Sequence, residues 1–317
     1  MAYVLALLAT NRRGGFTAAV LGAAAEAAAQ AGKVEVETVC LARYRFGPCL
    51  SSFWCARNGG EGCVLPDDMG AKGAGELYQK VRRANGLLLA TPVHTWGPSA
   101  LAHVFWERLY PFLYSDGLNG LPFGALACAT NQGFQRQAVA EMGKWAFCRG
   151  VRYLGGVAAH AMQREAKIDE ARRLGAAVGR AAVVDARGRR KFSDAEKYAY
   201  YVDGPWDVLQ PYLDNIADGQ EGLEGSLAEQ GRQNFVEGEA SELAGLAQEA
   251  FVRARAMRQE GDEGGAYQAL MRASAYWTRA TWKEFVEGFI SKRDDVEPYR
   301  GMPEPGTAAN TGGPAAD

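Results

Sequence analysis

The chain has 317 residues, of which 48% are hydrophobic and 23% are charged, and its formal net charge at pH 7 is −2. This balance is typical of a globular protein with one large domain or two ordinary ones. The near-neutral charge gives no support for a nucleic-acid partner. No stretch reaches the roughly 18 continuous apolar residues that a membrane span needs.

The first apolar run, residues 3–9 (YVLALLA), has the length of a buried strand. Arg12 and Arg13 follow this run, whereas a secretory or twin-arginine signal carries its positive charge before the apolar stretch. We therefore expect a strand rather than a leader, and a cytoplasmic protein. In that compartment the six cysteines are expected to be free thiols, metal ligands or redox groups rather than disulfides.

Strand-length apolar runs alternate with helical patterns over the first 185 residues. The predicted strands cover residues 3–9, 34–39, 86–93, 122–130 and 151–160. The predicted helices cover residues 16–32, 74–84, 99–113, 135–148 and 168–183. Such alternation predicts parallel βαβ units. Residues 1–185 are therefore predicted to form an α/β, flavodoxin-like, doubly wound domain with five parallel strands, whose ligands bind beyond the carboxyl ends of the strands.

The pattern changes after a basic run at residues 187–192. Residues 193–300 show helical segments and no convincing strand, so we predict an α-helical C-terminal region with a helical hairpin over about 239–259 and 264–290. One face of the second helix carries Tyr267, Leu270, Met271, Ser274, Trp277, Thr281 and Phe285. Residues 301–317 are rich in Pro, Gly and Ala and are expected to be disordered.

Two features of this C-terminal half can be interpreted either as structural or as ligand-binding. A core or subunit interface, rather than a ligand site, is expected from the aromatic residues Trp277, Trp282, Phe285 and Phe289. The basic run is a candidate for a nicotinamide 2′-phosphate, although a solvated linker is the favoured interpretation. Its charged members are Arg187, Arg189, Arg190 and Lys191.

The loop after the first predicted strand, residues 10–17 (TNRRGGFT), opens a helix. Backbone N–H groups at a helix start attract anions, and Gly14 and Gly15 let the backbone approach a phosphate closely. Arg12 or Arg13 would add charge. The alternative is a capped helix start with a solvated arginine pair.

The loops after the third and fourth predicted strands are also candidates. Residues 91–100 (TPVHTWGPSA) could present backbone amides to one edge of a flat ring, with Ser99 capping the next helix. The alternative there is an ordinary connection with Trp96 in the core. Residues 130–134 (TNQGF) are small and polar and carry little information alone.

Together these loops resemble those of the flavodoxin-fold, NAD(P)H-dependent FMN reductase family, especially its branch related to iron–sulfur flavoproteins. That family's first loop runs roughly G-S-P-R-x-G-G-N-T, and this chain has ALATNRRGGFT. Its second loop is matched by TPVHTWGPSALAHVFWER, which ends at Glu107-Arg108. A cysteine run followed by Asp67-Asp68-Met69 is also a family trait. The resemblance covers residues 1 to about 180.

The resemblance implies that FMN binds across the three loops, with its phosphate at residues 10–17 and its isoalloxazine between residues 92–97 and 130–133. The candidate cofactor residues are Thr10, Asn11, Arg12, Gly14, Gly15, Phe16, Thr17, Thr91, Pro92, Val93, His94, Thr95, Trp96, Gly97, Thr130, Asn131 and Gly133. The chain departs from the family pattern at four positions. These are Asn11 for Pro, Phe16 for Asn, His94 for Tyr and His103 for Lys.

We expect an FMN-dependent oxidoreductase that takes hydride from NADH or NADPH. Its acceptor would be a quinone, a flavin, a nitro or azo compound, an oxidised metal or a protein, and the sequence does not choose among them. Hydride transfer is the flavin's own chemistry, so we name no catalytic side chain except His94 as a possible proton donor, for which packing on the ring is the favoured interpretation. His103 and His160 are expected to be structural. The family is commonly oligomeric, which implies a homodimer or homotetramer.

Two alternatives remain open. The first is an iron–sulfur flavoprotein that passes single electrons through a cluster. The second is a non-enzymatic flavin-binding or scaffold protein whose work is done by the helical C-terminal region. The spectrum and the iron content of the purified protein would separate all three.

The stretch from residue 46 to residue 63 decides the first alternative. It contains Cys49, Cys55 and Cys63, with Ser52 where a fourth cysteine would complete C-x2-C-x2-C-x7-C. Such a run suits an iron–sulfur cluster, for which a serine oxygen is a poor ligand. We therefore expect no [4Fe-4S] cluster and a loop that lies over the flavin end of the sheet, where Phe53 and its neighbours would wall the flavin pocket or a subunit contact.

Overall fold

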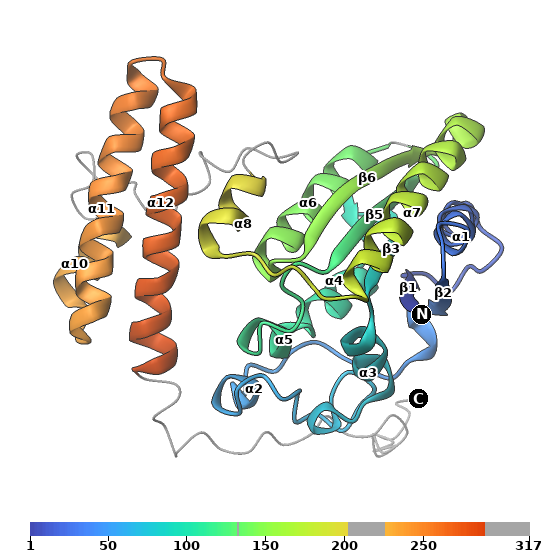
Figure 1. Cartoon of the computed structure of the whole chain (residues 1–317), viewed down its shortest axis with the longest axis horizontal. Coiled ribbons are helices and arrows are strands. Elements are labelled where there is room, and N and C mark those ends of the chain that lie inside the picture. The colour runs from blue at the N-terminus through green and yellow to red at the C-terminus, as the bar shows by residue number, and fades with distance from the viewer. Residues whose placement is uncertain (132, 202–225, 289–317) are drawn as a thin grey trace, which may run out of the picture.

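The computed structural model describes residues 1–131, 133–201 and 226–288. Its centre is a parallel sheet whose order is β2-β1-β3-β5-β6 (Figure 1). The strands are β1 (Ala2–Leu8), β2 (Val34–Cys40), β3 (Gly86–His94), β5 (Pro122–Ala129) and β6 (Arg152–His160). This is the order of a flavodoxin-like, doubly wound sheet, so the predicted fold class is confirmed.

The central strands are buried on both faces, as parallel sheets usually are. All seven residues of β1 are buried. Leu5 and Leu7 belong to the hydrophobic core on one face of the sheet, and Val4 and Ala6 belong to the core on the other. Such a strand reads as a continuous apolar run, which explains why it could be found in the sequence.

Helices cover both faces of the sheet (Figure 1). One face packs against α1 (Phe16–Ala29) and α7 (Arg164–Asp185). The other packs against α3 (Glu76–Arg83), α4 (Ala100–Glu107), α5 (Tyr110–Tyr114) and α6 (Gln135–Arg149). The short helix α2 (Trp54–Arg57) contacts α5. Single 3₁₀ turns lie at Leu41–Arg43, Ala71–Gly73 and Ala161–Gln163.

The single helix predicted over residues 99–113 is wrong, because two helices occupy that stretch. The helix α4 ends at Glu107, and α5 begins at Tyr110 with Pro111 in its first turn. Proline has no backbone N–H and favours the first turn of a new helix over a helix interior. The first helix therefore ends before Pro111, and a second helix begins at Tyr110.

The C-terminal helices are α8 (Asp194–Tyr201), α10 (Leu227–Asn234), α11 (Gly238–Gln259) and α12 (Glu263–Thr281), followed by a π-helical turn at Trp282–Glu287. The helices α11 and α12 form the predicted hairpin and share a core of their own that includes Phe251 and Leu270. Of the aromatic residues on the predicted apolar face, Phe285 is half exposed. The boundaries drawn at residues 185 and 193 stay predictions. Phe289 and the tail 301–317 lie outside the described residues.

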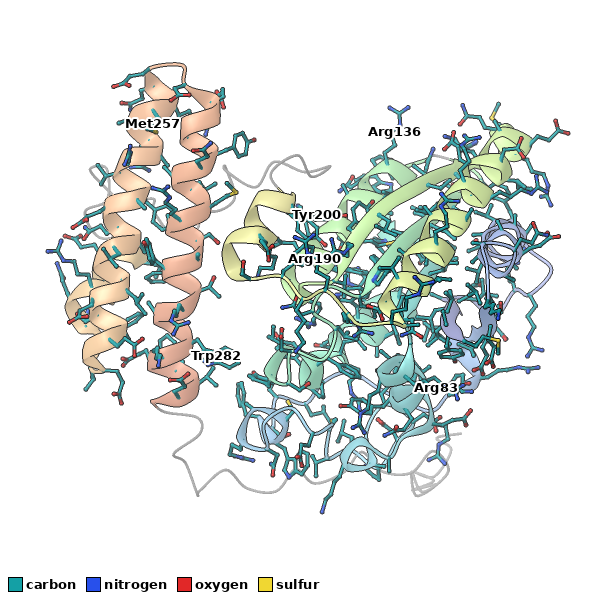
Figure 2. The ribbon with its side chains drawn as sticks, in the orientation of Figure 1. Arg83, Arg136, Arg190, Tyr200, Met257 and Trp282 are labelled. Atoms are coloured by element: carbon teal, nitrogen blue, oxygen red, sulfur yellow. The ribbon has the colours of Figure 1, made fainter. Side chains whose placement is uncertain are left out.

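The helix α8 lies between the hairpin and the sheet (Figure 1). Tyr201 is buried in the core that holds α3 to α6, and Tyr200 donates a hydrogen bond to the carbonyl of Tyr153 at 2.7 Å. At the end of the hairpin, Trp282 points toward α5 (Figure 2) and its ring lies 5.1 Å from that of Tyr114. The helical region is therefore docked by aromatic contacts.

The basic run after α7 is held in ion pairs. Arg189 bonds Asp185 at 2.8 Å and the carbonyls of Gly117 and Ala84. The other two pairs are Arg190 with Glu196 and Lys191 with Asp116, both at 3.0 Å. These contacts fasten the end of α7 to neighbouring segments. In the described ranges, no helix combines the length and the apolarity that crossing a membrane requires.

Candidate functional site

Three loops meet at the carboxyl ends of the strands, on either side of the β1–β3 switch in strand order. Ser99 ties two of them together, because its hydroxyl donates to the carbonyl of Ala9 at 3.0 Å and accepts from the N–H of Ala102 at the start of α4. Thr91 accepts the N–H of Ser99 at 2.9 Å and is fully buried. The side chain of Thr91 therefore holds the loops together and faces away from solvent.

The first loop leaves an open helix start. The cap residue of α1 is Gly15, no side chain caps it, and the first turn has no acidic residue. Residues 11–14 are exposed, and a Cβ added at Gly14 would meet nothing within 4 Å. Helix N–H groups that lack a cap, next to open space, suit an anion.

Two threonines of this loop play different parts. The hydroxyl of Thr10 accepts the N–H of Arg12 at 3.2 Å, which closes a turn at the end of β1. Thr17 is buried and hydrogen-bonds Cys128 on β5. Burial raises the pKa of the Cys128 thiol to about 12, and the bond from Thr17 opposes that rise. Thr10 thus shapes the loop, whereas Thr17 anchors the helix to the sheet.

The second loop is a two-residue hairpin. The strand β4 (Gly97–Pro98) pairs antiparallel with the end of β3, so that His94 faces Gly97. Thr95 and Trp96 form the turn, with φ of 49° and 65°. Positive φ at both central residues is the type I′ pattern that matches strand twist. Trp96 is 59% exposed, so the alternative that put it in the core is wrong.

The third loop brings an aromatic ring to the second. Phe134 is 39% exposed and stacks on Trp96, with ring centroids 4.8 Å apart and planes 14° apart. Gly133 and Phe134 both have positive φ, which turns the chain back into α6. Asn131 is fixed by its carbonyl, which lies 3.2 Å from the ring nitrogen of His160. The two loops therefore share one exposed aromatic surface.

Two residues at this end were not predicted. The side-chain oxygen Oε1 of Gln135 is buried and has no hydrogen-bond partner, 3.1 Å from where a Cβ on Gly133 would lie. The guanidinium of Arg164, the first residue of α7, lies 5.5 Å from the ring centroid of Phe16. Both begin helices that follow the fourth and fifth predicted strands, and that position was the only signal in the sequence.

The residues at this end fit an FMN. An uncapped helix start beside Arg12 suits the phosphate, and the exposed Trp96–Phe134 surface suits a flat ring. The orphan oxygen of Gln135 is an acceptor for a ring N–H. The predicted residues of the three loops are brought together here, although Thr91 and Thr17 turn their side chains into the protein.

The cysteine stretch lies elsewhere, so its expected place over the flavin end is wrong. It packs at the far end of α4, about 12 Å along that helix from Ser99 at 1.5 Å per residue. Glu107 accepts the N–H of Cys49 at 3.0 Å. A Cβ on Gly60 would meet the carbonyl of Pro111 at 2.4 Å, which shows how closely this loop lies against α5.

A buried ion pair explains this path. Arg108 is 1% exposed and holds both oxygens of Asp67, at 2.7 and 2.8 Å. The same guanidinium donates to the carbonyl of Gly47 at 2.8 Å and lies 3.5 Å from the sulfur of Cys63. Two-pronged pairs of this kind are strong and directional. Through Gly47 and Asp67, Arg108 holds the segments before and after the cysteine stretch against the end of α4.

The thiols are neighbours, and the donor set at the four cluster positions is three cysteines and the hydroxyl of Ser52. Burial, with a smaller contribution from the neighbouring Cys63 and Cys49, raises the pKa of Cys55 to about 11. Within the described residues, no three His, Cys, Asp or Glu side chains are arranged to hold a metal ion. The hydroxyl of Ser52 accepts the N–H of Trp54 at 3.4 Å. We therefore derive no electron-transfer step through a cluster.

The chain is similar to a family of FMN reductases and to two iron–sulfur flavoproteins. The family model described as NADPH-dependent FMN reductase matches residues 2–163, which is 162 of 317 residues. An iron–sulfur flavoprotein of Methanocaldococcus jannaschii is 27% identical over 140 residues, which is 44% of this chain and 68% of that protein. An iron–sulfur flavoprotein of Methanosarcina thermophila is 31% identical over 97 residues, which is 31% of this chain and 47% of that protein.

Among solved structures, an NAD(P)H:quinone oxidoreductase from Methanothermobacter marburgensis is 20% identical with a TM-score of 0.43. The match covers 55% of this chain and 94% of that one.

Proposed function

The chain belongs to the NADPH-dependent FMN reductase family, and from this premise we propose that it is a cytoplasmic FMN-dependent oxidoreductase that takes hydride from NADH or NADPH. Its acceptor would be a quinone, a flavin, a nitro or azo compound, or an oxidised metal. We also propose that it acts as a homodimer or homotetramer. The observation that carries the proposal is the meeting of an uncapped helix start with an exposed aromatic surface at one end of the sheet.

The phosphate would bind at the start of α1. The backbone N–H groups of Phe16 and Thr17 lie in the first turn, where no side chain competes for them. Arg12 is exposed beside them and supplies charge. Thr10 holds the preceding turn by accepting the N–H of Arg12.

The ring would bind against the second and third loops. Bound FMN supplies the hydride chemistry. The turn at Thr95–Trp96 presents backbone groups at the end of β3, and Gln135 offers an acceptor to the ring edge. His94 is exposed at the end of β3 and stays the candidate proton donor to a reduced acceptor. The stacked, exposed Trp96 and Phe134 would offer an apolar surface to one side of the bound ring.

A matched pair of glycine variants tests the phosphate site. Gly14 and Gly22 both have open space at the Cβ position, but Gly14 precedes α1 and Gly22 lies within it. Gly14→Asp puts a carboxylate where the phosphate would bind, so we expect the affinity of the full chain for FMN to fall more than tenfold and that for riboflavin to change little. Gly22→Asp should leave both unchanged. Flavin fluorescence titration measures all four affinities.

Measurements of NAD(P)H oxidation and of iron content separate the proposed oxidoreductase from the scaffold and iron–sulfur alternatives. The proposal expects FMN-loaded wild-type protein to oxidise NADH or NADPH with a quinone acceptor, measured as loss of absorbance of the nicotinamide. A protein that binds FMN but oxidises neither would favour the scaffold alternative. Stoichiometric iron in anaerobically purified protein would favour the iron–sulfur alternative, which the names of the two relatives suggest, and would contradict our prediction for Ser52.

A further inference from the structure

An unassigned cation lies beside the phosphate loop. Arg164 is the first residue of α7 and is exposed, and its guanidinium lies 5.5 Å from the ring centroid of Phe16. Phe16 is the first residue of α1. The contact therefore holds an arginine from the far end of the domain sequence next to the uncapped helix start. Arg164 is the first residue after the part of the chain that the family model matches, which ends at residue 163.

The exposed charges around this point are three arginines and one carboxylate, that of Glu165. Arg12 and Arg13 are exposed in the same loop, and neither they nor Arg164 form an ion pair among the residues that the structure describes. The first turn of α7 also carries Glu165, whereas the carboxylates one turn farther along are already paired. Those pairs are Asp169 with Arg172 and Glu170 with Lys167. The positive end of α1 adds to the same field.

We propose that Arg164 is a phosphate-binding residue of the FMN site and that Phe16 is the platform that orients it. This inference rests on the proposed function. Phe16 itself offers a phosphate no side-chain donor. The Arg164 guanidinium over the Phe16 ring supplies one, because a planar guanidinium stacks on aromatic faces while its N–H groups stay free to bind a phosphate in pairs.

Riboflavin provides the discriminating ligand, because it has the ring of FMN but no phosphate. In the full-length protein freed of flavin, we expect Arg164→Gln to weaken FMN binding about tenfold. Riboflavin binding should change less than about twofold, and raising the salt concentration from about 50 mM to about 500 mM should shrink the difference between wild type and variant. Flavin fluorescence titration gives these dissociation constants.

Arg172→Gln is the matched control. Arg172 lies on the same helix, is exposed and is already paired with Asp169, and its loss changes the net charge by the same amount. FMN affinity should stay that of the wild type. If Arg172→Gln weakened FMN binding as much as Arg164→Gln, the effect would be one of overall charge and the inference would be overturned.

A variant at Phe16 tests whether its aromatic ring orients Arg164. Phe16→Leu keeps an apolar side chain but removes the aromatic face, so we expect FMN affinity to fall several-fold with riboflavin affinity little changed. In the double variant the two losses should be less than multiplicative, because both remove the same contact. If the fold loss of FMN affinity in the double variant equalled the product of the two single losses, the proposed role of Phe16 would be overturned.

The outcomes also separate this inference from the proposed function. Wild-type protein that binds FMN, together with an Arg164→Gln variant that binds it equally well, would overturn the inference alone. Wild-type protein that binds no FMN would overturn both. Thermal unfolding of each variant confirms that the fold is retained before affinities are compared.

Discussion

The Cys55 thiol illustrates how burial sets the chemistry of one residue. Burial is the main cause that raises its pKa to about 11, and the neighbouring Cys63 and Cys49 contribute to the same rise. Only the thiolate reacts readily with alkylating reagents. In the folded protein near neutral pH, Cys55 is therefore protonated and slow to react, although two other thiols lie nearby.

Alkylation with iodoacetamide measures this effect. At pH 8 we expect Cys55 to react about 100-fold more slowly in the folded chain than in the urea-unfolded chain, because the pKa rises from 9.0 to about 11. The folded-state rate should climb as pH increases toward 11, since more thiolate forms. Peptide mass spectrometry assigns the label to the cysteine. Equal rates at pH 8 in the two states would refute the buried, protonated thiol.

The loops for the phosphate and the ring could be predicted because their residue types indicate a binding loop from the local sequence alone. Gly14, an adjacent arginine pair and a following helix indicate an anion site without any tertiary information. Arg164 and Gln135 could not be found in this way, because their value depends on which element lies opposite them. The inward turn of Thr91 is a tertiary fact of the same kind.

At the scale of elements, the packing of α1 on α7 depends on small residues. A Cβ on Gly175 would lie 2.0 Å from the carbonyl oxygen of Ala24, and one on Gly179 would lie 2.5 Å from that of Ala28. The two helices thus touch backbone to backbone through one face of α7. Any side chain there must push α1 off the sheet.

Gly175→Ala tests this contact. We expect it to lower the free energy of unfolding by about 3 kcal/mol, since the obstacle is rigid backbone and not a side chain that can move. The control is Gly22→Ala in α1, where the new Cβ meets nothing and a helix-favouring residue should add about 0.5–1 kcal/mol. Urea unfolding measures both. A neutral Gly175→Ala would mean that the helices are not in close contact.

Elements were predictable where one periodicity or one apolar run dominates. The strands β1, β3 and β5 are buried along most of their length, so their sequences are continuous apolar runs. The two-residue strand β4 is too short to leave a pattern. The break between α4 and α5 depends on Pro111, whose place in a first turn becomes clear only once the chain direction is known.

At the scale of the whole molecule, α8 joins the sheet to the helical hairpin. The hydroxyl of Tyr201 donates to the carbonyl of Val151 and accepts the N–H of Tyr153 at 3.2 Å. These groups lie at the start of β6, which is the last strand in the sheet order. Two tyrosines on one helix therefore bond backbone groups at the start of an edge strand.

Tyr201 and Tyr200 are adjacent but differ in burial, and this makes them a matched pair. Tyr201→Phe leaves a half-buried N–H and a buried carbonyl without that hydroxyl, so we expect a loss of about 2 kcal/mol in the free energy of unfolding. Tyr200→Phe removes one exposed hydrogen bond and should cost less than about 0.5 kcal/mol. Urea unfolding gives both values, and hydrogen exchange at Tyr153 should quicken only in Tyr201→Phe. Equal costs would contradict the buried role of Tyr201.

The arrangement of these parts was the least predictable level. The α11–α12 hairpin follows from its helical apolar face, but the contact of Trp282 with Tyr114 joins residues far apart in the sequence. The place of the cysteine stretch was missed for the same reason. It depends on Arg108 meeting Asp67, and neither residue signals its partner in the sequence.

The buried pair of Arg108 and Asp67 has an evolutionary consequence. The path of the cysteine stretch is set by this pair, by Glu107 and by close packing on α5, and none of these contacts involves residue 52. A mutation that exchanges serine and cysteine there leaves the scaffold in place. Selection can therefore gain or discard a metal ligand at that position in a single step, without first passing through an unfolded ancestor.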